Sequence, residues 1–331
     1  MEQERRSLRI GLAVIAGAVM LRVLGAGPLQ AITGFFSQKE VVSALIFLET
    51  GRVVRTGTVT ATLPEITEPA GVKQEPLSFQ PEDASLVQVS AVCDYPLQLE
   101  QLLTAPLSWD LTQETPTVLI LHTHATEAYT QTAAQSYQES SAYRTLDEQH
   151  NTVRIGSYLA ELLRAGGIQV IHDTGLHDYP DYSGSYSHAR KSIQQHLKEN
   201  PSICMVIDIH RDATDLSAAR QLTTHATVEG MDSAQLMMVV GTDAGGNLHP
   251  NWQENMALAV KLHTRLEKAY PGICRPISFR TQRFNQDLSA GAMLVEVGAA
   301  GNTLEEALLA TRVLAEGILS LASGVTAGST S

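Results

Sequence analysis

The chain has 331 residues, of which 44% are hydrophobic, and a formal net charge of −12 at pH 7. This length and apolar content suffice for a sizeable core and exclude an intrinsically disordered chain. Lys and Arg cluster only at the extreme N-terminus, so we expect no nucleic-acid partner, which would require a concentrated basic face. The three cysteines, Cys93, Cys204 and Cys274, lack CxxC spacing and indicate neither a disulfide framework nor a thiolate zinc site.

Residues 1–36 are predicted to form a short cytoplasmic tip and a membrane anchor. Arg5, Arg6 and Arg9 precede an apolar run from Ile10 to about Leu29, which is long enough to cross a bilayer once as a helix. Since basic flanks stay on the cytoplasmic side, the rest of the chain is expected on the extracytoplasmic side of the cell membrane. The alternative is a cleaved signal peptide, and it would export the remainder equally.

Residues 37–115 are predicted to be a stalk. Pro64, Pro69 and Pro76 interrupt a stretch rich in Glu, Gln and Thr that lacks sustained periodicity. Such a linker would hold a following domain away from the bilayer. The alternative for residues 85–92 is that they pair with that domain as an added strand.

From residue 116 onward the pattern alternates between strands and helices. Apolar runs predict strands over residues 117–121, 168–173, 203–210, 235–241 and 292–298. Helical spacing predicts helices over residues 152–165, 187–197 and 253–269, with a capping box at Thr303–Glu306 opening a last one. We therefore expect one α/β domain over residues 116–324, with a mostly parallel sheet and helices on both faces, and a flexible tail over residues 325–331.

Polar side chains accompany the ends of three of these strands. His122, His124 and Glu127 follow the first, His210 ends the third, and Glu296 lies in the last. The carboxyl ends of parallel strands meet at one edge of a sheet, so His124, His210 and Glu296 could converge there. Imidazoles and carboxylates are ligands that zinc accepts, although two hydrogen-bonded loop histidines are an equally ordinary interpretation of the HTH triplet.

Glu296 is a candidate for proton transfer. Val295 and Val297 flank it in a hydrophobic strand, and partial desolvation would move its carboxyl pKa toward neutrality. A catalytic zinc activates water for attack on an amide, and a carboxylate outside the ligand set can then move the proton. The alternative is a structural carboxylate paired with an arginine such as Arg211.

Five motifs in order resemble the stage II sporulation protein P family: HTHATEAY, HNTVRIGSYLAELL, DIHRDA, VGTDAGGNLHPNWQEN and MLVEVGAAGNTLEEA. The resemblance covers about residues 41–322, weakly in the stalk. It implies a membrane-anchored, zinc-dependent peptidoglycan hydrolase, related in fold to the N-acetylmuramoyl-L-alanine amidases. It also implies cleavage of the amide between N-acetylmuramic acid and the stem peptide, a second endopeptidase activity on cross-links, and work at the engulfing sporulation septum beside stage II sporulation proteins D and M.

The resemblance also implies roles for individual residues. In the related amidases a histidine, a glutamate and a later histidine bind zinc, and a glutamate of the last strand transfers protons. Matched to this chain, the zinc ligands are His124, Glu127 and His210, and the catalytic residue is Glu296. His122 is the alternative to His124; for the middle ligand, Asp147, Glu148 and especially His150 are alternatives, because the family's ligand precedes the helix that begins near Asn151.

Substrate contacts are expected from Arg211 and from His249 and Asn251 of the HPNW loop, for which a purely structural role is the alternative. The loop carrying Tyr179, Tyr182 and Tyr186 could stack on substrate or simply cover the sheet edge. The competing functional class is a non-catalytic module that binds peptidoglycan or a partner. Three reactive side chains on three separate strands favour the enzyme.

Overall fold

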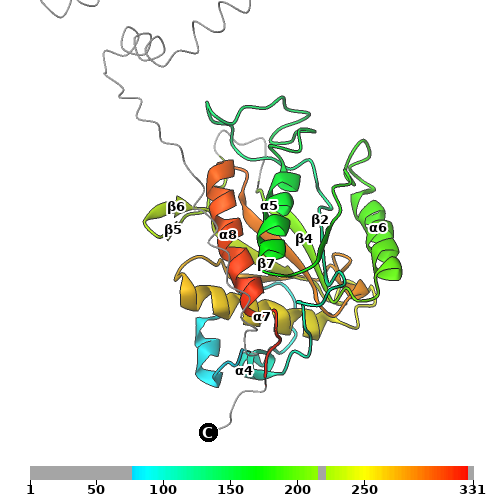
Figure 1. The fold of residues 1–331 in the computed structure, drawn as a ribbon, viewed down its shortest axis with the longest axis vertical. Coiled ribbons are helices and arrows are strands. Elements are labelled where there is room, and N and C mark those ends of the chain that lie inside the picture. The colour runs from blue at the N-terminus through cyan, green and yellow to red at the C-terminus, as the bar shows by residue number, and fades with distance from the viewer. Residues whose placement is uncertain (1–76, 215–220, 327–331) are drawn as a thin grey trace, which may run out of the picture. The chain divides into compact units, whose positions relative to one another are not determined.

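The computed structural model describes residues 77–214 and 221–326, which build a seven-stranded sheet with helices packed on it (Figure 1). The strand order is β1-β8-β7-β9-β4-β2-β3. Its strands are β1 (Val89–Ala91), β2 (Val118–Leu121), β3 (Val170–His172), β4 (Met205–Asp212), β7 (Leu236–Val240), β8 (Ile277–Phe279) and β9 (Ala292–Ala299). Every neighbouring pair is parallel except β7 and β9, so the predicted mostly parallel α/β sheet is confirmed.

Helices cover both faces of the sheet, as predicted. The helices are η1 (Pro81–Leu86), α4 (Leu99–Thr104), α5 (Thr152–Ala165), α6 (Ser185–Glu199), α7 (Trp252–Ala269), η2 (Gln286–Leu288) and α8 (Leu304–Ser320). In β2, Val118 and Ile120 point into the core formed with α5, α7 and α8, whereas Leu119 and Leu121 pack with α6 on the other face. Burial of both faces explains why β2 is apolar throughout.

Local sequence signals define the helix ends. α5 spans the predicted residues, and the Asn151 side chain caps it by accepting a hydrogen bond from the Val153 N–H. At α8, Thr303 and Glu306 form the predicted capping box. A separate hairpin of β5 (Ala226–Val228) and β6 (Met231–Ser233) stands apart from the main sheet.

The described part of the predicted stalk packs on the domain. β1 pairs in parallel with β8 at the sheet edge, which is the alternative foreseen for residues 85–92. Phe79, Leu103 and Leu111 are buried in the main core. The folded unit therefore starts before residue 116, because these apolar side chains find their burial on it.

The predicted flexible tail is wrong for its first residues. Val325 is buried, and its backbone exchanges two hydrogen bonds with Leu107. Thr326 donates its N–H to the carbonyl of Leu77. These bonds tie the chain to the domain through residue 326.

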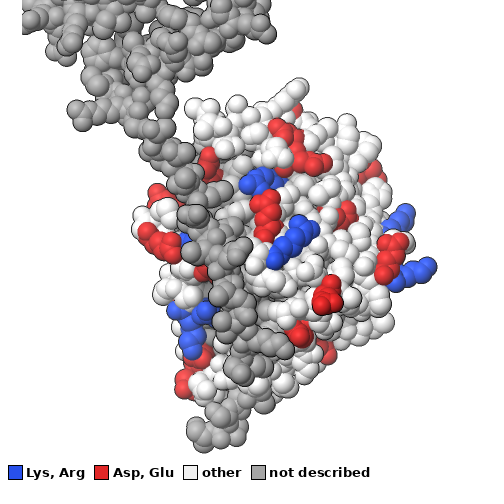
Figure 2. All heavy atoms as spheres, viewed as in Figure 1, with Lys and Arg blue, Asp and Glu red and all other residues white. Residues whose placement is uncertain are grey.

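The predicted anchor and the first part of the stalk, residues 1–76, lie outside the described residues. Among the helices that the structure does describe, none is long and apolar enough to span a bilayer. On the face shown in Figure 2, acidic and basic side chains are interspersed, without the concentrated basic area that nucleic-acid binding requires.

Candidate active site

A pocket of about 330 Å³ opens beside β4 and β9, under the loop that follows β2. It brings together the proposed zinc ligands, the proposed catalytic residue and one predicted substrate residue. These are His124, Glu127, His210, Glu296 and Arg211. Further lining comes from Arg144, Tyr182, Tyr186, Arg280 and Phe284.

The sheet register places His210 and Glu296 together in this pocket. β4 and β9 run in parallel, with His210 directly opposite Glu296. Both residues lie inside their strands rather than at the ends, so it is the pairing of the two strands that brings them together. The pairing shifts between His210 and Asp212, immediately beyond this point.

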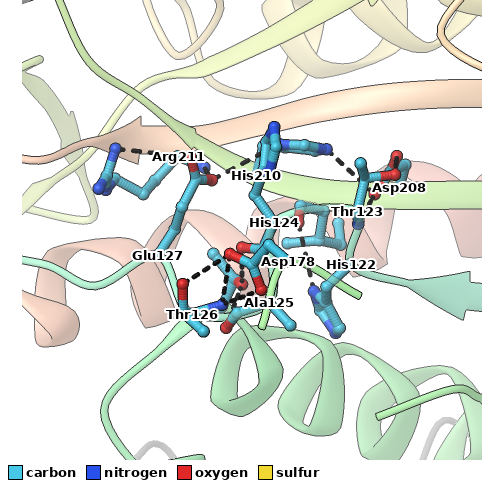
Figure 3. A network of polar contacts seen from close by, with 12 residues as sticks. His122, Thr123, His124, Ala125, Thr126, Glu127, Asp178, Asp208, His210 and Arg211 are labelled. Carbon is cyan, nitrogen blue, oxygen red and sulfur yellow. Dashed lines mark hydrogen bonds and ion pairs between the residues drawn. The ribbon is translucent and has the colours of Figure 1, made fainter. Parts of the chain in front are cut away.

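His122 and His124 separate because β2 ends at Leu121. The side chain of His122 is buried and points away from His210 (Figure 3). Its Nδ1 lies 3.2 Å from the carbonyl oxygen of Ile209, and its Nε2 lies 2.9 Å from the Nε2 of His172. Burial lowers the pKa of His122 to about 3, so it is a neutral core histidine. Of the two, only His124 lines the pocket.

His210 lies between two carboxylates. Its Nδ1 is 3.5 Å from Oε2 of Glu127, and its Nε2 is 3.1 Å from Oδ1 of Asp208 (Figure 3). The rings of His124 and His210 stand perpendicular, with centroids 5.2 Å apart. Burial alone would lower the pKa of His210, but the charges of Asp208 and Glu127 raise it well above the ordinary value.

Glu127 is held by arginines. Its Oε2 accepts the backbone N–H of Arg211 at 3.2 Å, and its Oε1 lies 3.3 Å from Nη2 of Arg144. Burial by itself would raise the pKa of this carboxyl, but the charge of Arg211 and the neighbouring His210 lower it. Glu127 is therefore an ionised, well-oriented carboxylate.

The pKa of Glu296 is shifted in the opposite direction to that of Glu127. Burial raises its pKa to about 8, and the charges of Glu127 and Asp212 add to that shift against the opposing effect of His210. Its Oε2 is buried without a hydrogen-bond partner. Arg211, the alternative partner, instead donates to the carbonyls of Ala128 and Tyr143. A carboxyl with its pKa raised in this way suits proton transfer, the role that the sequence analysis expects of Glu296.

Two of the three tyrosines of the predicted loop reach the site, Tyr182 from the loop before α6 and Tyr186 from the first turn of α6. Tyr182 stacks on His124 with ring centroids 4.8 Å apart and planes 14° apart, and Tyr186 meets the same ring edge-on at 5.6 Å. The guanidinium of Arg144 lies over the ring of Tyr182, 4.7 Å from its centroid. Tyr182 thus orients His124 and stands at the pocket wall.

Three predicted residues lie elsewhere. The Nδ1 of His150 pairs with Oδ2 of Asp147 at 2.8 Å, outside the pocket. His249 is buried. Asn251, the residue before α7, donates its side-chain N–H to the carbonyl of Asp287. Neither residue of the HPNW loop lines the pocket, so among the predicted substrate residues only Arg211 does.

Sequence reasoning missed three side chains that hold the site in place. The buried carboxylate of Asp208 accepts the N–H and the hydroxyl of Thr123, at 2.7 and 2.6 Å, and so fixes the loop before His124. Asp178 does the same for Thr126 and also pairs with Arg144 at 2.8 Å. An Asp inside an apolar strand was a usable signal for Asp208, whereas Arg144 comes from an irregular loop without any pattern.

The donor types in the pocket fit zinc. Nδ1 of His124 is buried without a hydrogen-bond partner, and a bound cation would satisfy it. The set of two imidazoles and one carboxylate is one that zinc accepts. Within residues 77–214 and 221–326, however, no three His, Cys, Asp or Glu side chains already stand in a metal-binding arrangement, and Glu127 is engaged by Arg144 and Arg211.

Comparisons with known proteins agree with the sequence motifs. The sequence profile of the family described as stage II sporulation protein P (SpoIIP) matches residues 61–319. Stage II sporulation protein P of Bacillus subtilis (strain 168) is 29% identical over 210 residues, which cover 60% of this chain and 49% of that protein. The chain thus spans about half the length of this curated relative.

Several solved amidases, among them the N-acetylmuramoyl-L-alanine amidase AmiC2, show a weak structural similarity. AmiC2 of Nostoc punctiforme is 16% identical, with a TM-score of 0.34 over 61% of this chain and 95% of that one. CwlD from Clostridioides difficile, solved in complex with the GerS lipoprotein, is 15% identical, with a TM-score of 0.38 over 61% and 94%. Scores this low carry no argument about function. The profile match, which spans most of the sequence, does decide the family: the chain belongs to the stage II sporulation protein P family.

Proposed function

We propose that this chain is a zinc-dependent hydrolase of peptidoglycan that cleaves the amide between N-acetylmuramic acid and the stem peptide. The observation that carries the proposal is that His210 and Glu296 lie opposite each other on the neighbouring strands β4 and β9, in a pocket that also holds His124 and Glu127. Burial raises the pKa of the Glu296 carboxyl to about 8. Family membership supports the same substrate.

In this proposal His124, Glu127 and His210 hold the metal. Zinc, when bound, lowers the pKa of its water to ~7 and so supplies hydroxide for attack on a carbonyl carbon. A metal ligand needs a free lone pair. The ionised carboxylate of Glu127 and the Nδ1 of His124, which has no hydrogen-bond partner, both offer one.

Glu296 moves the proton. Its Oε2 has no competing hydrogen bond, so the oxygen is free to take a proton from the attacking water and give it to the departing amide nitrogen. Arg211 is anchored to two backbone carbonyls, and with Arg144 it presents positive charge to a pocket that must accommodate a polarised carbonyl oxygen. Tyr182 fixes the ring of His124.

The cellular setting is part of the proposal. An N-terminal span with its basic flank inward would place the pocket outside the cytoplasm, where peptidoglycan is accessible. Membership in a sporulation family supports work at the engulfing septum, beside stage II sporulation proteins D and M, and a second activity on peptide cross-links.

Digestion of purified peptidoglycan by the full-length protein in detergent tests the function. Mass spectrometry should find stem peptides with a free N-terminal alanine and glycan strands without peptide. Chelation should abolish this release, and added zinc should restore it. The alternative function, a module that binds peptidoglycan without cleaving it, would give binding without soluble products.

A further inference from the structure

A second pocket of about 420 Å³ adjoins the first. Tyr186 and Phe284 line both pockets, and their ring centroids are 6.0 Å apart. The two rings therefore form a shared wall between the pocket of Glu296 and a second one lined by Arg190 and Arg283. A ligand that occupies both pockets would contact this aromatic pair.

The shared wall is built with backbone strain. Phe284 and Asn285 have φ values of 49° and 59°, in the left-handed region, which is unusual for a bulky residue such as Phe284. The side chain of Gln286 holds this loop in place. Gln286 accepts the N–H of Gly241 and donates to the carbonyl of Val239, both at 2.8 Å, which ties the loop to β7. Strain of this kind persists where surrounding contacts enforce it, and it concentrates at ligand-binding sites.

Asn285 links the wall to the second pocket. Its Nδ2 donates to the carbonyl of Tyr186 at 2.9 Å, and its Oδ1 accepts from Arg190 at 3.4 Å. The side chain of Asn285 thus holds both the backbone of Tyr186 and the guanidinium of Arg190. The wall and the charged part of the second pocket are a single bonded unit.

The second pocket carries net positive charge. Arg190 forms a bidentate pair with Asp287, at 2.7 and 2.9 Å, and Arg283 lies 3.6 Å from the same carboxylate. One carboxylate between two guanidinium groups leaves one positive charge uncompensated. The side chain of Arg283 is 32% exposed, so this guanidinium is available to a ligand.

We infer that the second pocket binds a free carboxylate on the peptide part of the substrate while the scissile amide occupies the first pocket. This inference rests on the proposed function for the identity of the substrate. In peptidoglycan the lactyl carboxyl of the sugar is consumed by the amide, so free carboxylates belong to the stem peptide and not to the glycan. A guanidinium with unused donors matches a carboxylate, whereas a neutral sugar would not need the charge.

Arg283 and Phe284 have different roles in this proposal. Arg283 recognises the charge of the ligand, and Phe284 contacts the peptide backbone where it passes between the pockets. Substituting Arg283 should therefore weaken only ligands with a carboxylate, whereas substituting Phe284 should weaken charged and neutral ligands alike.

Binding of a soluble peptide tests this without any need for catalysis. The probes are a synthetic stem tetrapeptide, L-Ala-D-isoGlu-L-Lys-D-Ala, and the same peptide with its carboxyls converted to amides, titrated calorimetrically into the full-length protein. The free acid should bind more tightly to the parent. Arg283→Gln should weaken binding of the free acid about ten- to 150-fold, as for loss of a charge-assisted hydrogen bond, and leave the amide form unchanged.

Lys191→Gln is the matched control, because Lys191 is an exposed cation on α6, next to Arg190 in sequence, and does not line the second pocket. It removes the same charge and should leave both affinities as in the parent. Phe284→Ala should weaken the two peptides by the same factor. Equal affinity of the parent for acid and amide, or an equal loss with Arg283→Gln and Lys191→Gln, would overturn the inference. Peptide binding with this pattern in a protein that releases no stem peptide would instead refute the proposed function and leave the second pocket standing.

Discussion

His210 and Glu296 face each other across β4 and β9, which are adjacent and parallel. The pairing is fixed by the apolar residues that alternate with them, since Ile209 and Val295 form the neighbouring pair and both are buried. A slip of one residue would bring a valine to the pocket in place of the carboxyl. The sheet therefore sets the distance between the His210 imidazole and the Glu296 carboxyl more rigidly than a loop would.

Glu296→Gln should abolish turnover while leaving substrate and zinc bound. The amide keeps the size of the side chain but has no titrating oxygen, and loss of general acid–base help typically costs ~10²–10⁴ in rate. Zinc content and peptidoglycan pull-down, measured beside stem-peptide release, separate the roles. Loss of zinc would make Glu296 a ligand, and release at the parental rate would move the proton transfer to another residue.

The pH dependence of turnover in the parent follows from the same carboxyl. Glu296 must be ionised to accept a proton, so the rate should fall as the pH drops through its pKa. That value is about 8 in the metal-free protein, and a bound cation would lower it toward the ordinary 4.5. Initial rates between pH 4 and 9 should therefore show an acid limb inside this window.

His124→Ala and His210→Ala should each fold and hold sub-stoichiometric zinc. Each substitution removes one of the three proposed zinc ligands. The loss should weaken zinc binding more than it weakens the packing of the core. His150→Ala is the control, because His150 is a histidine of the same domain that pairs with Asp147 outside the pocket. Elemental analysis of the three purified variants decides the assignment; full zinc in both ligand variants would show that the metal binds elsewhere.

Tyr182→Ala should lower zinc affinity by about tenfold, because partners that orient a metal ligand commonly contribute 10- to 100-fold. Tyr182→Phe keeps the ring that stacks on His124 and should behave as the parent. Competition with a chelator of known affinity measures the difference. If the phenylalanine variant lost as much affinity as the alanine variant, the hydroxyl rather than the stacking would be responsible.

Lys261 gives a stability prediction far from the site. Its amine is buried in α7 and donates to the carbonyl of Leu102, and burial lowers its pKa from 10.5 to about 8. Between these values the unfolded chain binds more protons than the folded chain, so the stability of the parent should rise with pH across this window and level off at its lower value below about pH 8.

Relative to Lys261→Met, the parent should gain on the order of 3 kcal/mol in free energy of unfolding between pH 7 and 10.5. Urea unfolding of both proteins at several pH values measures it. If the free energies of unfolding of the two proteins changed with pH in the same way, this amine would keep an ordinary pKa in the folded state.

The proposed orientation in the membrane predicts that protease added to intact protoplasts removes nearly the whole protein. Only the segment before Ile10 should remain protected on the cytoplasmic side, together with the span itself. Immunoblotting with an antibody against the C-terminal domain, beside a cytoplasmic control protein, reports the result. Survival of the domain in intact protoplasts would reverse the orientation.

Much of the fold was predictable because its signals are local. The limits of α5 follow from a capping Asn151 and from Gly166 at the other end, and α8 follows from its capping box. β8 was missed because three residues, Ile277–Phe279, are too short to show a period. The antiparallel direction of β7 depends on long-range pairing with β9, which no local pattern encodes.

The site was predictable where it depends on strands and not where it depends on loops. His210 and Glu296 lie in regular strands, so their meeting follows from the topology of the sheet. The choice between His122 and His124 depends on β2 ending at Leu121, one residue before the first histidine. Arg144 reaches the pocket through an irregular loop, and its contacts with Glu127 and Asp178 exist only in the folded chain.

The two ends of the described domain meet at one place, where Leu77 and Val325 bridge in parallel and Leu107 pairs with Val325. Leu77 donates to the carbonyl of Gly324 and accepts from Thr326, so the first and last described residues are bonded to each other. Joining residue 326 to residue 77 would therefore need only a short linker, and new ends could be opened at the turn between β5 and β6. Such a circularly permuted domain would lack the proposed N-terminal anchor, so comparing its peptidoglycan hydrolysis with that of the full chain would measure what the anchor contributes to the proposed activity.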